Sequence, residues 1–445
     1  MAQTDAQKIY DATGEQIQSW HYHSCLETGR RHQTIGLQVI LKDPEFSRVE
    51  ATLGILVCRH ESLRTYFAMS DGIVKQCVVP YDKRLFAPQY YDIRGRDPES
   101  AIAEILDSPA GDLFTVDTPP LMRTLIFRVS ESLASIHLIV HHIVFDLWSK
   151  KILLNELTEI YRSLGRGLPV SADPHPIQLR DYAIWQKDWL RHNTKAAILF
   201  WRSKLQQPMS QPVPGGVDAT LSVLNTVKAD RYLQFFDEPA FKALRSLSAR
   251  AGTGVATVLY ASLAILFYLL EPESRPLLAM PVACRHYPWS RSIVGYLMGG
   301  LYLYPSIEKE LPLIEFIRTL FAEFLQSAGY LIYDHAIYEL NEPNLRCNCT
   351  IFVNYSDANA GQRLEPKDAE GYYPVNEPAY YALAWETFEY ENGLQCSWKY
   401  NPARLDATRI GTIVSLHKTL VRQICDQPEI SLSELQRAIT PTVAV

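Results

Sequence analysis

An apolar segment that ends in two adjacent histidines is the feature that most constrains this chain. Residues 135–145 read Ser-Ile-His-Leu-Ile-Val-His-His-Ile-Val-Phe, a composition typical of a buried β-strand. Because side chains alternate along a strand, His141 and His142 are predicted to point to opposite faces. One imidazole can then pack inside the protein while the other handles a proton near pH 7. Asp146 follows four residues after His142.

The same residues also allow a purely structural interpretation. An isolated pair of histidines is more often a satisfied part of a core or a strand end than a catalytic site. Asp146 precedes a segment of helical period, residues 147–164, and aspartate is a favoured N-cap. If its carboxylate is buried, it needs a cation or several backbone donors. Neither role makes Asp146 a proton-transfer residue.

Composition narrows the class of protein. The 445 residues suit two domains of roughly 200 residues each. A hydrophobic content of 47% with 21% charged residues is typical of a soluble globular protein, and the net charge of -6 argues against nucleic acid or an acidic membrane as partner. No run of about 18 apolar residues appears, and residues 1–8 lack a signal-peptide core, so we expect a cytoplasmic protein.

The eight cysteines are scattered, without the paired spacing of a zinc site. Cys347 and Cys349 share one face of a predicted strand, but no second pair accompanies them. We therefore expect buried free thiols and no metal.

A break rich in proline and glycine, residues 206–218, separates two patterned halves. We predict an N-terminal domain at 1–176, a connecting helix and linker at 177–217, and a C-terminal domain at 218–445. Helical periods cover 46–60, 147–164, 195–205, 239–251 and 255–270; strands are predicted at 121–128, 134–144 and 277–282, and a hairpin with an Asn-Gly turn at 385–400. The pattern indicates an α/β or α+β fold with two layered domains.

Three motifs resemble those of the condensation domains of nonribosomal peptide synthetases. Residues 141–149 resemble the motif His-His-x-x-x-Asp-Gly, which also occurs in the wider chloramphenicol-acetyltransferase-like superfamily. Residues 59–67, Arg-His-Glu-Ser-Leu-Arg-Thr-Tyr-Phe, and 181–186, Asp-Tyr-Ala-Ile-Trp-Gln, resemble two further condensation-domain motifs. Looser similarities lie at Gln16, Trp20, 281–285 and 293–296, so the resemblance spans roughly residues 13–425.

The chain departs from the family pattern in three places. Leu147 stands where the family has glycine, Met298-Gly299-Gly300-Leu301 replaces an expected Asn-Thr, and a later motif survives only as a vestige at 335–339. The resemblance therefore predicts intact catalytic residues with unusual substrate contacts.

The resemblance implies a fold, a reaction and a partner. The fold would be two chloramphenicol-acetyltransferase-like subdomains in a V-shaped pseudo-dimer with a tunnel between them. The enzyme would be an acyltransferase of antibiotic biosynthesis that joins an acyl or peptidyl thioester to an amine, or less often an alcohol. A carrier protein would deliver the donor on its phosphopantetheine arm, with no bound cofactor. Orienting two tethered reactants can supply several kcal/mol.

The resemblance also assigns roles to residues. His142 is expected to be catalytic, as a general base or as a group that positions the amine, and His141 to pack on the opposite face. Asp146 is expected to pair with an arginine, with Arg285 as first and Arg64 as second candidate, although Arg64 could also lie at the surface or a helix end. The expected tunnel residues are Leu147, Trp148, Ser149, Gly295 and Tyr296; Ser149 could equally be a simple helix N-terminal residue.

Other functions remain open. The same histidine would serve transfer to an alcohol, from a carrier protein or from coenzyme A. A non-catalytic recruitment domain is a further alternative, which the intact His-His motif disfavours. Carrier docking could use Arg30-Arg31, or 285–291 with Trp289. If the 445 residues are the whole product, a free-standing enzyme is expected; otherwise the chain is one domain of a larger synthetase.

Overall fold

The computed structural model describes residues 7–25, 34–106, 114–205, 228–271, 277–330, 350–356, 371–378, 383–403 and 405–443. The chain divides into two compact units. Unit 1 consists of Met1–Asn193 with Ala283–Met298, and unit 2 of Thr194–Val282 with Gly299–Val445. The segment Ala283–Met298 thus belongs to unit 1, whereas the predicted C-terminal domain, 218–445, included it. Both units mix helices and strands, which confirms the expected α/β class.

The main sheet of unit 1 has the strand order β2-β7-β6-β5. Its strands are β2 (Thr34–Lys42), β5 (Gln89–Asp92), β6 (Met122–Arg128) and β7 (Leu133–His141). β7 runs antiparallel to β2 and β6 on its two sides, so it is an interior strand, and its apolar residues after Leu133 are buried. The strand predicted at 134–144 ends at His141, because the chain then enters a short 3-10 turn, η4 (His142–Val144).

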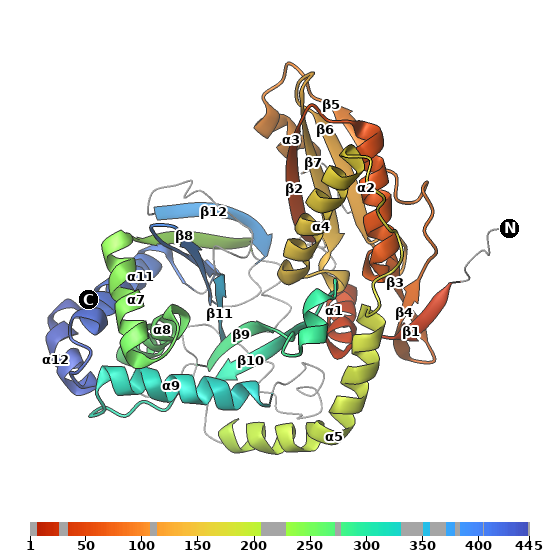
Figure 1. Cartoon of the computed structure of the whole chain (residues 1–445). Coiled ribbons are helices and arrows are strands. Elements are labelled where there is room, and N and C mark those ends of the chain that lie inside the picture. Colours follow the sequence, from red (N-terminus) through yellow and green to blue (C-terminus); the bar gives the residue numbers. More distant parts are fainter. Residues whose placement is uncertain are drawn as a thin grey trace. The chain divides into compact units, whose positions relative to one another are not determined.

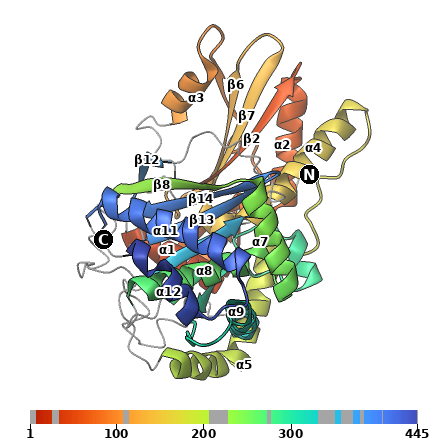
Figure 2. The same cartoon turned by 90° about the vertical axis from the view of Figure 1, so that its left-hand side faces the viewer.

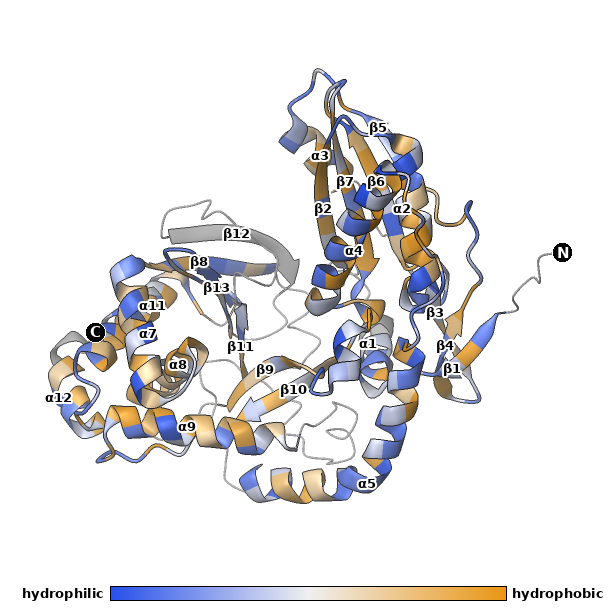
Figure 3. Cartoon of the chain, viewed as in Figure 1, coloured by the Kyte–Doolittle hydropathy of each residue, from blue (hydrophilic) through white to orange (hydrophobic). Residues whose placement is uncertain are grey.

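Two helices lie beside this sheet in Figure 1, α2 (Phe46–Arg59) and α4 (Leu147–Gly165). They pack against each other, and each buries an apolar stripe at helical spacing. In α2 the stripe includes Val49, Leu53 and Leu56. Figure 3 shows the resulting distribution of hydropathy: much of β6 and β7 is hydrophobic, and the helices carry both hydrophobic and hydrophilic residues.

Smaller elements complete unit 1. A second sheet has the order β1-β4-β3, from β1 (Lys8–Asp11), β3 (Thr65–Ser70) and β4 (Ile73–Val78). The remaining elements are α1 (Gly14–Cys25), η2 (Glu61–Arg64), α3 (Pro98–Leu106), η5 (Pro288–Ser292) and the first part of α5 (Leu179–Leu205). The helix predicted at 195–205 is therefore only the end of the much longer α5.

The sheet of unit 2 has the order β10-β9-β11-β13-β14-β8-β12. Its strands are β8 (Lys228–Phe236), β9 (Leu277–Ala283), β10 (Met298–Leu303), β11 (Thr350–Ser356), β12 (Gly371–Pro378), β13 (Leu383–Tyr390) and β14 (Gly393–Tyr400). β13 and β14 form the predicted hairpin around Asn392-Gly393. Gly393 is required there, because a Cβ would lie 2.5 Å from the carbonyl oxygen of Phe236.

The helices of unit 2 are α7 (Glu238–Ala251), α8 (Val255–Leu270), α9 (Leu313–Ala328), α11 (Ala407–Asp426) and α12 (Leu432–Val443). Figure 2 shows α7, α8 and α11 grouped beside β8, β13 and β14. α8 is buried along most of its length, which explains why its sequence is apolar on every side.

Within the described ranges, no single helix has the length and apolarity of a membrane span; α7 and α8 pass that test only together, across a 97° bend.

Five cysteines whose side chains are described are free thiols, and three of them are buried as predicted. Cys77, Cys284 and Cys396 are buried, and Cys58 and Cys425 are half-buried. The pair Cys347 and Cys349 lies outside the described residues.

Candidate active site

The two histidines at the end of β7 have different environments. His141 is fully buried, its Nδ1 accepts a hydrogen bond from the backbone N–H of Ile143 at 3.1 Å, and its ring packs edge-on to Phe114. His142 begins the turn η4 and is partly exposed. The end of the strand therefore separates a packed imidazole from an accessible one.

The backbone fixes the tautomer of His142. Its Nδ1 lies 2.7 Å from the carbonyl oxygen of Phe145, which can only accept, so Nδ1 carries a proton and donates it. In the neutral ring Nε2 is then the nitrogen with a lone pair. The ring also packs edge-to-face on Tyr296, with centroids 4.8 Å apart. His142 can thus accept a proton or a hydrogen bond at one defined atom.

Asp146 is a capping residue and half of a buried ion pair. Its Oδ1 accepts from the backbone N–H of Ser149 at 2.7 Å, which caps α4. The Nη2 of Arg285 lies 2.9 Å from Oδ1 and 2.8 Å from Oδ2, and the N–H of Leu297 donates to Oδ2 at 3.1 Å. Since both side chains are almost completely buried, these donors supply what a carboxylate needs away from water.

Arg285, the first of the two candidates, is thus the arginine that pairs with Asp146. Arg64 instead donates from Nε to the carbonyl of Val57 at 2.9 Å and from Nη1 to that of Val79 at 2.6 Å. Its role is to tie the end of α2 to the strand pair β3 and β4.

The buried network extends to Ser149 and Gly295. The Ser149 hydroxyl lies 2.6 Å from Asp146 Oδ1 and accepts from the backbone N–H of Gly295 at 2.9 Å. A Cβ on Gly295 would lie 2.8 Å from the Leu179 side chain, so a larger residue does not fit without movement. Both residues were expected along a substrate tunnel, but both are buried and serve the ion pair.

Arg285 also organises its own segment. Its Nη1 donates to the carbonyls of Ser290 and Ile293 at 3.0 and 2.7 Å. Val294 joins the hydrophobic core of unit 1. The Asp146–Arg285 pair therefore fastens the segment Ala283–Met298 to the turn that carries His142.

Leu147 and Trp148 are the exposed part of the motif, at 42% and 44% of their surface. The Trp148 Nε1–H donates to the carbonyl of Arg291 at 2.9 Å, so its ring is held in place. Leu147 is the first residue of α4 and has no positive φ, so the backbone here does not demand the glycine of the family. The departure adds an exposed apolar side chain close in sequence to His142.

One of the residues suggested for carrier docking is buried. Arg285 is buried in its ion pair and is not available to a partner. Arg30 and Arg31 lie outside the described residues, as does the vestigial motif at 335–339.

The role of α1 in supporting the turn of His142 was not predicted from the sequence. Thr13 and Gln16 form a reciprocal cap, and Gln16 Nε2 donates to the carbonyl of Ile143 at 3.4 Å. Gln186 of the motif at 181–186 accepts from the N–H of Gly14 at 2.8 Å. The spacing Thr-x-x-Gln is that of a capping box and was the available signal.

Comparison with known proteins identifies relatives of this chain. Residues 8–440 match the family described as condensation domain. A linear gramicidin synthase protein of Brevibacillus parabrevis is 30% identical over 277 residues, 61% of this chain. Malpinin synthetase of Mortierella alpina is 25% identical over 397 residues, 86% of this chain. The chain spans only 5% of the length of each of these two proteins.

Solved structures share the fold. The X-domain from teicoplanin biosynthesis has a TM-score of 0.77 at 18% identity, covering 95% of this chain and 96% of that one. A structure described as the molecular basis for condensation-domain-mediated chain release from the enacyloxin polyketide synthase has a TM-score of 0.72 at 15% identity, covering 96% and 84%. Both likenesses cover nearly all of this chain.

Proposed function

Because this chain belongs to the condensation-domain family, whose members act as acyltransferases in nonribosomal peptide synthetases, we propose that it forms an amide. The donor is an acyl or peptidyl thioester on the phosphopantetheine arm of a partner carrier protein, and the acceptor is an amine. The observation that carries the proposal is the bond from His142 Nδ1–H to the carbonyl of Phe145, which makes Nε2 the nitrogen with the lone pair in the neutral ring.

The chemistry needs orientation and one proton acceptor. The amine nitrogen attacks the thioester carbon, a C–N bond forms, the C–S bond breaks, and the carrier arm leaves as a thiol. His142 Nε2 accepts a hydrogen bond or the proton from the attacking amine. Such general-base action contributes about 10²- to 10⁴-fold to a rate, and fixing two tethered reactants adds to it.

Asp146 and Arg285 act through structure in this proposal. Asp146 follows Phe145, the residue whose carbonyl orients His142, and it caps α4. The ion pair holds this turn, so both residues position His142 and neither touches the reacting atoms.

Intact-mass spectrometry of an acyl-loaded carrier protein tests the proposal. The carrier is incubated with a panel of amines and alcohols and with wild-type protein, His142→Ala or the control His192→Ala, which changes a largely exposed histidine of α5. We expect loss of the acyl group and a new amide with wild type and His192→Ala only. An undiminished rate with folded His142→Ala would sink the assignment.

The same panel separates the alternatives. An ester product in place of an amide would make the protein an O-acyltransferase with the same histidine. An acyl group that stays in place while carrier and protein co-elute would support a non-catalytic recruitment domain.

A further inference from the structure

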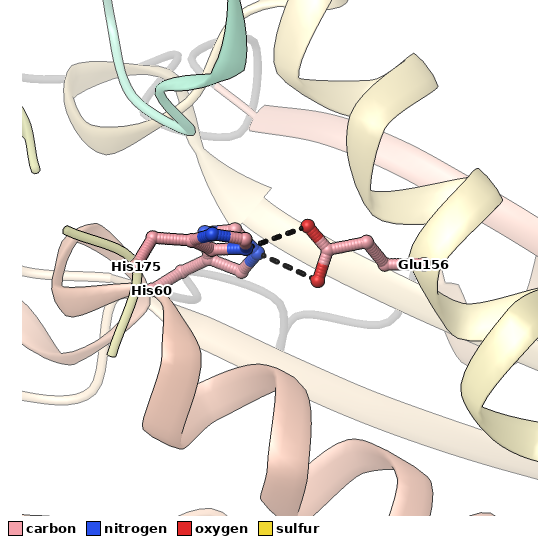
Figure 4. A group of neighbouring side chains, drawn as sticks. All are labelled: His60, Glu156 and His175. Carbon is pink, nitrogen blue, oxygen red and sulfur yellow. Dashed lines mark hydrogen bonds and ion pairs between the residues drawn. The ribbon is translucent and has the colours of Figure 1, made fainter. Parts of the chain in front are cut away.

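Two histidines and a glutamate from separate segments of unit 1 face one another, away from the motif of His142. His60 directly follows α2, Glu156 lies in α4, and His175 lies between α4 and α5. Figure 4 shows the two rings overlapping, with a nitrogen of each directed at the carboxylate, and their centroids lie 4.8 Å apart. One nitrogen or oxygen of each residue lies within 4.8 Å of the others.

The distances between these atoms are close to those between the ligands of one ion. His175 Nε2 lies 2.9 Å from Glu156 Oε1, and His60 Nε2 lies 3.2 Å from Oε2. With ligand bonds of about 2.0–2.2 Å, atoms around a tetrahedral Zn²⁺ are separated by about 3.3–3.6 Å. The candidate ligand atoms all lie within 4.8 Å of one another, so side-chain adjustment within this distance would let them share a cation.

His60 supplies a second, independent observation. Only 2% of its side chain is exposed, and its buried Nε2 has one ion-pair contact, with Glu156 Oε2 at 3.2 Å, but no hydrogen bond of regular geometry among the described residues. A buried polar atom of this kind calls for an explanation. A cation at this point would use the lone pair of that nitrogen.

Arg59 determines which carboxylate oxygen is available. Its Nη1 donates to Glu156 Oε2 at 3.1 Å, and its Nε donates to the carbonyl of Ser171 at 3.0 Å. Oε2 is therefore shared with a guanidinium, while Oε1 faces His175. The positive charge of Arg59 also partly neutralises the Glu156 carboxylate and weakens its attraction for a cation. The two imidazoles must therefore supply most of the binding.

We propose that His60 Nε2, Glu156 Oε1 and His175 Nε2 form a site for one divalent transition metal, with Zn²⁺ as the best match to two imidazoles and one carboxylate. His175 is 35% exposed, which leaves room for water as the fourth ligand. The ion replaces the direct contact between His175 and Glu156 and joins α2, α4 and the connection that follows. It takes no part in the chemistry of His142.

The site is tested by removing bound metal from the full chain with a chelator and then titrating the chain with Zn²⁺ in a calorimeter. We expect one Zn²⁺ per chain and a higher melting temperature with Zn²⁺ present. His175→Gln and Glu156→Gln should each weaken binding at least tenfold. The matched control is His192→Gln, since His192 is 72% exposed and lies in the same unit.

His175→Gln is the first variant to examine, because His175 is partly exposed and its substitution leaves the core intact. Saturable binding lost in His175→Gln and kept in His192→Gln supports the site. Equal affinities of wild type and His175→Gln, or no saturation by wild type at millimolar Zn²⁺, overturn it. Carrier-protein assays on the metal-free chain test the proposed function separately.

Discussion

Arg285 donates from a single guanidinium nitrogen to both carboxylate oxygens of Asp146, at 2.9 and 2.8 Å, across 139 positions of sequence. Both side chains are buried, so neither charge has water as a substitute partner. The pair is therefore a structural ion pair. Removing either partner leaves an uncompensated charge inside the protein.

Asp146→Ala should lower the free energy of unfolding by about 3–5 kcal/mol, because Arg285 stays buried without its carboxylate and α4 loses its cap. Chemical denaturation measures the change. The control is Asp188→Ala, a 70% exposed aspartate, for which a change within about 0.5 kcal/mol is expected. A normal stability with lost activity would contradict the structural role of Asp146.

His142→Ala should reduce activity while leaving stability nearly unchanged, in contrast to Asp146→Ala. The side chain is partly exposed, so we expect a small change in melting temperature but a rate of amide formation reduced about 10²- to 10⁴-fold. Single-turnover transfer from a loaded carrier protein measures the rate. The interpretation fails if the folded variant retains more than a tenth of the wild-type rate.

The local elements around the site were predictable because their signals are local. A continuous apolar segment indicated β7, helical spacing indicated α4, and Asn392-Gly393 indicated the hairpin of unit 2. The end of β7 was predicted three residues too late. The apolar run continues through Val144 without a turn residue, and only the backbone of η4 shows where pairing stops.

Contacts between distant segments were not predictable from these patterns. Ser149 and Gly295 are bonded across 146 positions, and nothing near either residue indicates that a hydroxyl and a backbone N–H meet there. The cluster of His60, Glu156 and His175 was equally unpredictable. Its members lie in three segments, and the local patterns of these segments indicate only a helix end, a helix and a loop. Tertiary packing decides both arrangements.

Leu147→Gly tests the departure from the family motif. The substitution removes a 42% exposed side chain from the first turn of α4, so stability should fall by only about 1 kcal/mol or less. If Leu147 limits access to His142, the variant should accept bulkier amines than wild type. Competition between small and bulky amines, read by product mass, measures this; an unchanged product ratio would show that Leu147 does not limit access.

The buried side chain of His417 is expected to make the stability of unit 2 depend on pH. This histidine of α11 is fully buried, and burial lowers its pKa to about 3. Its Nδ1 lies 3.2 Å from Gln234 Oε1 and its Nε2 lies 2.9 Å from the Ser262 hydroxyl, so the neutral ring has partners on both sides.

Because the folded pKa of His417 lies below the unfolded value of about 6.5, only the unfolded chain binds a proton between these values. The contribution of His417 to stability is therefore complete above about pH 6.5 and falls as the pH drops toward about 3, with a limiting slope of about 1.4 kcal/mol per pH unit. Denaturant unfolding of wild type and His417→Gln from pH 7 to pH 4 measures it. We expect the variant to be less stable at pH 7 but to lose less stability on acidification, whereas His192→Gln should match the wild-type slope. Parallel curves for wild type and His417→Gln would contradict a neutral, buried His417.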